Sequence, residues 1–208
     1  GDLVVGGSFS NVNGAPINGV ARWNGSTCSP LGTGFFAEVR SLVRLPNGDI
    51  IATGNFLGGG PVPLRAIARW DGTTWSALGS GLTVLAGGGI GRALAVLPNG
   101  DLVVGGSFTG AGGVPVNNIA RWNGTAWFPF GNGLPTAVWS DGIESLAVAA
   151  NGNVVASGTF TISGGAPSDY LSRWNGSTWS SIGSGVTGIV HAVAFAANGD
   201  LFAGGPFW

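Results

Sequence analysis

Four polar side chains occupy one repeating position, seven residues before an Asn-Gly pair. They are Arg40, Arg92, Glu144 and His191, the last being the only histidine of the chain. Guanidinium, carboxylate and imidazole groups that converge can bind a charged ligand. If this position begins the first strand of each repeat, the four side chains form a ring around one mouth of a central channel. The alternative is that they are solvated, or paired with one another, at the strand ends.

Trp139 is the single best candidate for a contact residue. It lies outside the repeat register, next to Asp141, in the connection from Pro135 to Gly142. This connection and the one from Thr83 to Gly91 are five residues longer than their counterparts in the other repeats. Loops of variable length on a constant scaffold often carry specificity, and an exposed tryptophan is frequently the centre of an interface. We therefore expect binding near the channel mouth and the long connections.

Residues for catalysis are scarce. The only glutamates are Glu38 and Glu144, five of the seven aspartates lie in repeat turns or at equivalent positions, and Tyr170 is the only tyrosine. Glycosidases usually need two neighbouring carboxylates, and a Ser-His-acid triad would need an elbow motif that is absent around His191. Cys28 stands where other repeats have tryptophan, which favours a packed thiol. The sequence predicts no catalytic residue, no cofactor and no metal.

A repeat of about fifty residues organises the chain. Arg-Trp pairs recur at steps of 47, 52 and 52 residues, and glycines of a second motif recur at steps of 47, 52, 52 and 47. Two markers with one period define a repeat architecture. The predicted boundaries within this single domain of residues 1–208 are approximately 1–47, 48–99, 100–151 and 152–198, with a partial repeat at 199–208.

Each unit is predicted to contain four strands, which in the third unit cover 93–97, 102–108, 118–122 and a segment around Trp127. The turn from Pro98 to Asp101 contains Asn-Gly, which predicts a type I′ hairpin with positive φ at both central residues. Repeated four-stranded antiparallel units bury their apolar faces by packing around an axis. The predicted fold is all-β: a β-propeller of about four blades, alone or as part of a larger ring or assembly.

The strand ending in Gly105-Gly106, followed by Trp122 and Trp127, resembles the kelch motif, and the pattern recurs along essentially the whole chain. It departs from that motif because Trp replaces Tyr, the aromatic spacing is five and an Arg precedes each first Trp. The resemblance is to a secreted, bacterial-style kelch-like propeller. Kelch propellers include enzymes, adhesion modules and scaffolds, so the resemblance implies a fold and leaves the function open.

Arginines and tryptophans repeat in every unit. An arginine ring could bind anions, or each arginine could hydrogen-bond carbonyls and stack on aromatic rings. The tryptophans could stack on sugars between blades, or pack blade against blade, which we favour. Three Asn-Gly-Ser/Thr sequences match the glycosylation sequon but are equally explained as turns. The repeated arginines are Arg22, Arg69, Arg121 and Arg173. The repeated tryptophans are Trp23, Trp70, Trp75, Trp122, Trp127, Trp174 and Trp179.

Composition excludes several partners. Gly and Pro number 41 and 11, hydrophobic residues make up 44%, and charged residues only 8% with a net charge of -1. A nucleic-acid surface needs a basic patch, which is missing, and no apolar run reaches the roughly 18 residues of a membrane span. The single cysteine excludes an internal disulfide. Without an initial methionine or signal peptide, the chain is expected to be processed or part of something longer.

The two ends of the chain carry versions of the same strand, at 2–9 and 200–207, and both cannot fill one slot of a closed ring. The surplus strand is expected to be displaced, to pair with another molecule, or to belong to a larger ring, since an unpaired apolar strand is a template for association. We therefore interpret the chain as a non-catalytic extracellular or cell-surface module that binds protein partners or itself. A carbohydrate-binding propeller and a domain of a larger secreted enzyme are the alternatives.

Overall fold

Five consecutive antiparallel sheets, which we call blades 1 to 5, make up the computed structural model of the protein. It describes residues 1–58, 63–84, 87–136, 142–163, 165–168 and 170–207. Blade 1 contains β1 (Leu3–Gly6), β4 (Val20–Trp23) and β5 (Cys28–Pro30); blade 2 contains β6 (Val39–Arg44), β7 (Ile50–Gly54), β8 (Ile67–Trp70) and β9 (Trp75–Ala77). Blade 3 contains β12 (Ile90–Val96), β13 (Leu102–Ser107), β16 (Ile119–Trp122) and β17 (Trp127–Pro129). Blade 4 contains β18 (Ile143–Val148), β19 (Val154–Gly158), β22 (Leu171–Trp174) and β23 (Trp179–Ser181), and blade 5 contains β24 (Ala192–Phe195) and β25 (Leu201–Gly204).

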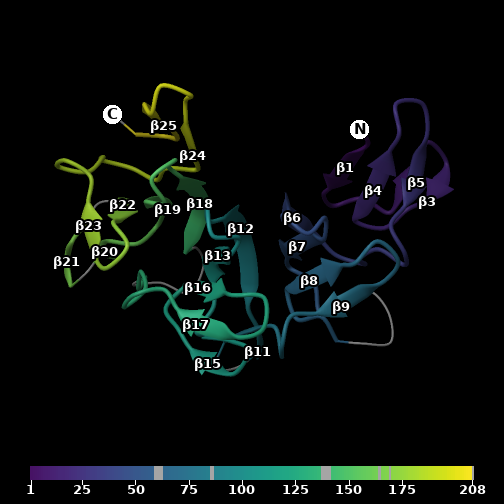
Figure 1. Ribbon diagram of the computed structural model, residues 1–208, viewed down its shortest axis with the longest axis horizontal. Coiled ribbons are helices and arrows are strands. Elements are labelled where there is room, and N and C mark those ends of the chain that lie inside the picture. Colours follow the sequence, from purple (N-terminus) through teal and green to yellow (C-terminus); the bar gives the residue numbers. More distant parts are fainter. Residues whose placement is uncertain (59–62, 85–86, 137–141, 164, 169, 208) are drawn as a thin grey trace.

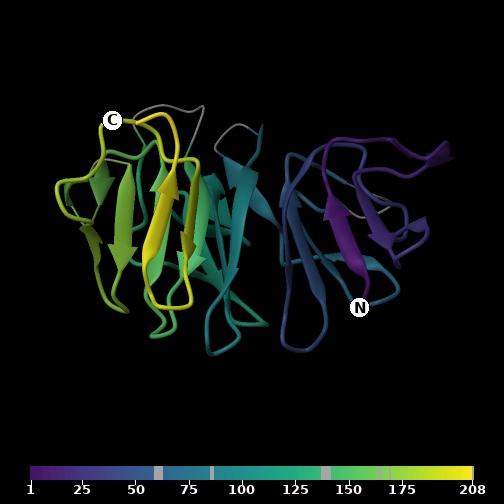
Figure 2. The same cartoon turned by 90° about the horizontal axis from the view of Figure 1, so that it is seen from above.

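The blades follow one another in an arc, with the first strands β6, β12, β18 and β24 toward its inner side (Figure 1). Blades 2, 3 and 4 each have four strands in the predicted order, and the all-β propeller fold is confirmed. Among the described residues, no strand of blade 1 pairs with β24 or β25. The terminal strands β1 and β25 thus fill the second position of two separate blades, and β1 and the β24–β25 hairpin lie apart from each other when the arc is viewed from above (Figure 2).

In blades 1, 3 and 4 the connection from the second to the third strand contains a short hairpin, and in blade 2 its described part contains an isolated bridge between Gly58 and Pro63. The long connection after blade 2 adds another hairpin, which pairs with the one in blade 3. These are β2 (Asn11–Val12) with β3 (Ala15–Pro16), β10 (Leu82–Val84) with β11 (Gly87–Gly88) and β14 (Gly110–Ala111), β14 with β15 (Val114–Pro115), and β20 (Ile162–Ser163) with β21 (Ala166–Pro167). Within the described parts of the chain there is no helix long and apolar enough to cross a membrane.

The turn between the first two strands differs from the predicted type I′ geometry. In blade 3, Gly100 has a φ of 88°, but Asn99 is not among the residues with positive φ. The Gly100 N–H donates to the Leu97 carbonyl at 2.9 Å, which closes a four-residue turn with Pro98 at its second position. Proline fixes φ near −65°, which suits a type I turn and not type I′. Blades 4 and 5 make the same turn with alanine in place of the proline, since Gly152 and Gly199 donate to the Ala149 and Ala196 carbonyls. The prediction was wrong because it placed Asn and Gly at the two central positions, whereas they occupy the third and fourth positions of the turn.

Every complete blade has a β-bulge at the same place in its first strand. The register of β12 against β13 shifts between Gly91 and Ala93, so Arg92 is the extra residue, and β6 and β18 are bulged in the same way. The glycine opposite the bulge permits this geometry: a Cβ on Gly106 would lie 2.1 Å from the Ile90 carbonyl oxygen. A bulge re-aims one side chain out of the strand alternation. The repeated glycine and the repeated polar residue therefore belong to the same β-bulge: the glycine leaves space for it, and the polar residue is the extra residue in it.

The hydrophobic core lies between blades rather than within them. Four clusters of buried residues fill the spaces between consecutive blades. In blades 2, 3 and 4, a tryptophan at the start of the fourth strand joins the blade to the one before it: the indole N–H of Trp127 donates to the Leu78 carbonyl at 3.0 Å. Trp75 and Trp179 make the same bond to Leu31 and Phe130 at 2.9 and 3.0 Å. These bonds give the fourth-strand tryptophans a structural role.

Candidate functional site

Three residues of the predicted polar ring, Arg40, Arg92 and Glu144, are the extra residues of the β-bulges, and His191 has the equivalent position in blade 5. Arg92 and Glu144 lie on neighbouring first strands, and Nη1 of Arg92 is 2.8 Å from Oε1 of Glu144. Their side chains are only 11% and 17% exposed, so this ion pair is largely shielded from water. Arg40 instead pairs with Glu38, two residues away, also at 2.8 Å. The backbone N–H of His191 donates to the Gly204 carbonyl, at the bulge position of blade 5.

The arrangement has a clear chemical consequence. The Arg92 and Glu144 charges neutralise each other, and a shielded, compensated pair offers little charge to a ligand. The two remaining predicted contact residues are Trp139 and Asp141, and both lie outside the described residues. Among the described residues, no group of three His, Cys, Asp or Glu side chains lies close enough together to hold a metal ion.

Replacing Glu144 with glutamine is expected to lower the free energy of unfolding by about 2 kcal/mol, because it removes a charged partner from the shielded Arg92 guanidinium. Urea denaturation of both proteins measures the difference. Glu38→Gln is the matched control, since its partner Arg40 is more exposed, and there we expect a loss of about 0.5 kcal/mol. Equal losses in the two variants would contradict the shielding argument.

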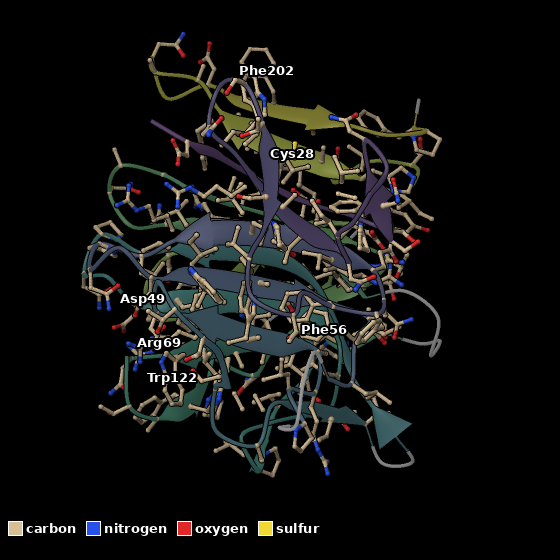
Figure 3. The ribbon with its side chains drawn as sticks, turned by 90° about the vertical axis from the view of Figure 1, so that its right-hand side faces the viewer. Cys28, Asp49, Phe56, Arg69, Trp122 and Phe202 are labelled. Carbon is tan, nitrogen blue, oxygen red and sulfur yellow. The ribbon has the colours of Figure 1, made fainter. Side chains whose placement is uncertain are left out.

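Arg22, Arg69 and Arg121 each pair with an aspartate that directly precedes the second strand of their blade, whereas Asn153 stands at the equivalent position of the repeat that contains Arg173. Arg69 Nε lies 2.6 Å from Oδ2 of Asp49, and Arg121 Nη1 lies 3.0 Å from Oδ2 of Asp101. Figure 3 labels Asp49 and Arg69, which lie near each other. Arg22 makes the same pair with Asp2. Arg121 also lies over the Phe128 ring, 5.2 Å from its centroid, as the stacking interpretation expected. The carboxylate partners were missed, although Asp49 and Asp101 each directly follow an Asn-Gly pair in the sequence.

The third-strand and fourth-strand tryptophans of one blade pack together as tilted pairs. Their ring centroids are 5.4 Å apart for Trp70 and Trp75, and 5.3 Å for Trp122 and Trp127. This packing supports the structural interpretation for most of the set. Trp23, in blade 1, is the exposed member at 42% and has Cys28 opposite it in place of a tryptophan.

Asp71 is an ionised side chain that acts as a turn residue. The backbone N–H of Thr74, with the hydroxyl and backbone N–H of Thr73, holds the pKa of this carboxyl well below its usual range. In the other three repeats an asparagine accepts the same bonds through its Oδ1, as Asn123 does from Thr125 and Ala126. The hydrogen-bonding geometry of the turn is thus common to the repeats, and only its charge differs.

A lowered folded-state pKa means that ionised Asp71 stabilises the fold above the unfolded-state pKa of about 3.9, and that this contribution is lost as the pH falls below it. We expect the stability advantage of the natural protein over Asp71→Asn to shrink between pH 5 and pH 2.5, because asparagine keeps the turn bonds without titrating. Urea denaturation at both pH values measures it. An advantage that is the same at both pH values would contradict the assignment.

Two features that the sequence analysis missed stand out in the structure. The first is a groove of about 430 Å³ between blades 1 and 2, lined by Arg22, Arg44 and Trp70 among others. The only available sequence signal was that Arg44 replaces an apolar residue of the other repeats. The second is the exposure of Leu3, Val5 and Phe202 on the end blades, which the surplus strand signalled only indirectly.

Comparison with known proteins supports the fold. Residues 97–124 match a family described as a β-propeller domain of unknown function, DUF5122. No curated protein sequence matches the chain significantly. The extracellular domain of a hybrid two component system from B. thetaiotaomicron superposes with a TM-score of 0.64 at 11% identity, over 99% of this chain and 25% of that one.

Two further structures show how widely this architecture is used. Virginiamycin B lyase from Staphylococcus aureus gives a TM-score of 0.53 at 14% identity, over 88% of this chain and 55% of that one. A chain of the mitotic checkpoint complex gives 0.51 at 16% identity, over 82% and 47%. The chain thus spans between a quarter and just over half the length of these three structures. Identities this low establish the fold and no more. With its repeated four-stranded blades, the chain is a β-propeller protein.

Proposed function

We propose that this chain is a non-catalytic structural and assembly module that acts outside the cell through its two end faces. The observation that carries the proposal is the exposure of apolar side chains there. Leu3 and Val5 are 54% and 41% exposed on blade 1, whereas Leu102 and Val104 at the same positions of blade 3 are 1% and 0% exposed. In blade 3 these two residues belong to the cluster that packs against blade 2.

The end face formed by blade 5 is also exposed, and it is the opposite kind of surface, one that packs on a following blade elsewhere in the chain. Phe202 of blade 5 is 62% exposed and stands at the rim of the molecule (Figure 3). Its equivalent Val103 is 0% exposed and packs against blade 4, the blade that follows. One end face is thus a surface that normally packs on a preceding blade, and the other is a surface that normally packs on a following blade.

The partner that fits both surfaces is a second copy of this chain, arranged head to tail. The interfaces between blades inside the chain bring together the same two kinds of face, so the end of one copy offers what the beginning of the next requires. Such an interface is heterologous, because the two contacting surfaces differ, and it can propagate from copy to copy. The protein-binding propellers among the similar structures agree with a partner-binding role.

Sedimentation velocity over a concentration series tests this proposal. We expect the mass to rise with concentration in the natural chain and to fall to that of one chain in Val5→Asp and in Phe202→Asp. Leu57→Asp is the control, since Leu57 is 66% exposed but lies in blade 2, away from the ends. Mixing the Val5→Asp and Phe202→Asp chains leaves one intact face of each kind, so we expect a dimer. A natural chain that stays monomeric at every concentration would refute the proposal.

A further inference from the structure

The groove between blades 1 and 2 has the chemistry of a binding site that is independent of the end faces. It encloses about 430 Å³, and its walls bring together Asp2, Arg22, Ser29, Arg44 and Trp70. That volume falls in the range of small-molecule sites, which combine an apolar surface with a few polar groups that fix orientation. The groove therefore needs a ligand whose chemistry matches two cations, one carboxylate, a hydroxyl and an indole.

Arg44 is what distinguishes this groove from the spaces between the other blades. The residue four positions after the bulge is Arg44 in blade 2, whereas the equivalent residues are Val96, Val148 and Phe195. The guanidinium of Arg44 folds over the adjoining turn, with Nη2 3.7 Å from the point where a Cβ of Gly48 would lie. Within the described parts of the chain, no ion pair involves Arg44.

The remaining charges leave the groove positive. Arg22 is already paired with Asp2 across β4 and β1, so these two side chains cancel. Arg44 supplies the net cation. A guanidinium is always ionised and binds a carboxylate through two parallel hydrogen bonds. A ligand with a carboxylate is therefore favoured at the end of the groove that Arg44 lines.

Trp70 gives the groove a flat apolar wall. Its ring is supported from within by Trp75, at a centroid distance of 5.4 Å, and by Gly32, where a Cβ would lie 2.9 Å from the Trp70 ring. A supported indole is a rigid platform for the C–H face of a sugar ring. The hydroxyl of Ser29 can bond the sugar hydroxyls from the opposite wall.

We propose that this groove binds an acidic saccharide, with the carboxylate of a uronic acid on Arg44 and the sugar ring on Trp70. This assignment does not depend on self-assembly. The test uses calorimetric titration of the Phe202→Asp chain at low salt with a galacturonic acid trisaccharide, so that binding is measured whether or not the chain associates. The neutral galactose trisaccharide and inorganic phosphate are titrated in parallel.

We expect the acidic trisaccharide to bind at least tenfold more tightly than the neutral one or phosphate. Arg44→Val, which restores the residue of the neighbouring repeat, is expected to weaken it at least tenfold, and Trp70→Phe several-fold. Arg65→Gln removes an exposed cation elsewhere in blade 2 and is expected to leave it unchanged. Equal binding of the neutral sugar, phosphate binding as tightly as the saccharide, or no effect of Arg44→Val would each overturn the proposal, as would no binding at millimolar concentration.

Discussion

Gly106→Ala is expected to lower the free energy of unfolding by about 3 kcal/mol, because the new methyl group has no space. A Cβ at this position would lie 2.1 Å from the Ile90 carbonyl oxygen and 3.0 Å from the Gly91 Cα. Both are backbone atoms of the bulged strand β12, so relief requires moving the strand itself. Urea denaturation monitored by tryptophan fluorescence measures the loss.

Gly7→Ala is the matched control for this experiment. Gly7 is the equivalent glycine of blade 1, where none of the described residues forms a first strand opposite it, and a Cβ there would meet only the Phe9 ring, at 3.3 and 3.4 Å. We expect a change of about 0.5 kcal/mol, in the range of ordinary surface substitutions. If both variants lost the same stability, the cost would come from the loss of glycine itself and not from the bulge.

Trp127→Ala is expected to cost about 4 kcal/mol, a large share of the roughly 5–15 kcal/mol that stabilises a typical domain. The side chain is 5% exposed, belongs to the core between blades 2 and 3, and donates its indole N–H to the Leu78 carbonyl. The substitution removes both the packing and the bond. Thermal and urea denaturation measure the effect.

Two further substitutions separate these contributions. Trp127→Phe keeps much of the aromatic packing and removes the N–H donor, so we expect a loss of at least 1 kcal/mol from the missing hydrogen bond. Phe128→Ala changes the next residue of the same strand, whose side chain is 37% exposed because alternate residues face opposite sides of a sheet. We expect it to cost less than about 1 kcal/mol. A loss as large as that of Trp127→Ala would contradict the inter-blade assignment.

A compensating exchange between blades 2 and 3 shows how closely packing depends on neighbours. Gly105 in the second strand of blade 3 faces Ile143 in the first strand of blade 4. At the equivalent positions one blade earlier, Thr53 of blade 2 faces Gly91 of blade 3, where the first strands of blades 2 and 4 have Val39 and Ile143. A Cβ on Gly91 would meet the Thr53 side chain, and one on Gly105 would meet Ile143. The larger residue can thus stand on either side of an interface, provided that the other side is glycine.

The strands, their order and the repeat period could be predicted from the sequence because they depend on local patterns: apolar runs, Asn-Gly turns and the spacing of Arg-Trp pairs. The position of the polar residues was visible for the same reason. Their pairing was not, since Arg92 and Glu144 are 52 residues apart and meet only when two blades pack. The bulge that aims them is equally a property of paired strands.

The sequence by itself determined a β-propeller of repeated four-stranded blades, since each repeat carries its own strand and turn signals. Only the tertiary structure decided that the terminal strands occupy separate blades, that Arg44 and Trp70 line one groove, and that Leu3, Val5 and Phe202 are exposed. Each of these depends on how successive blades are placed around the axis. That placement arises from contacts between residues about fifty positions apart, such as the indole bond from Trp127 to Leu78, which no local pattern encodes.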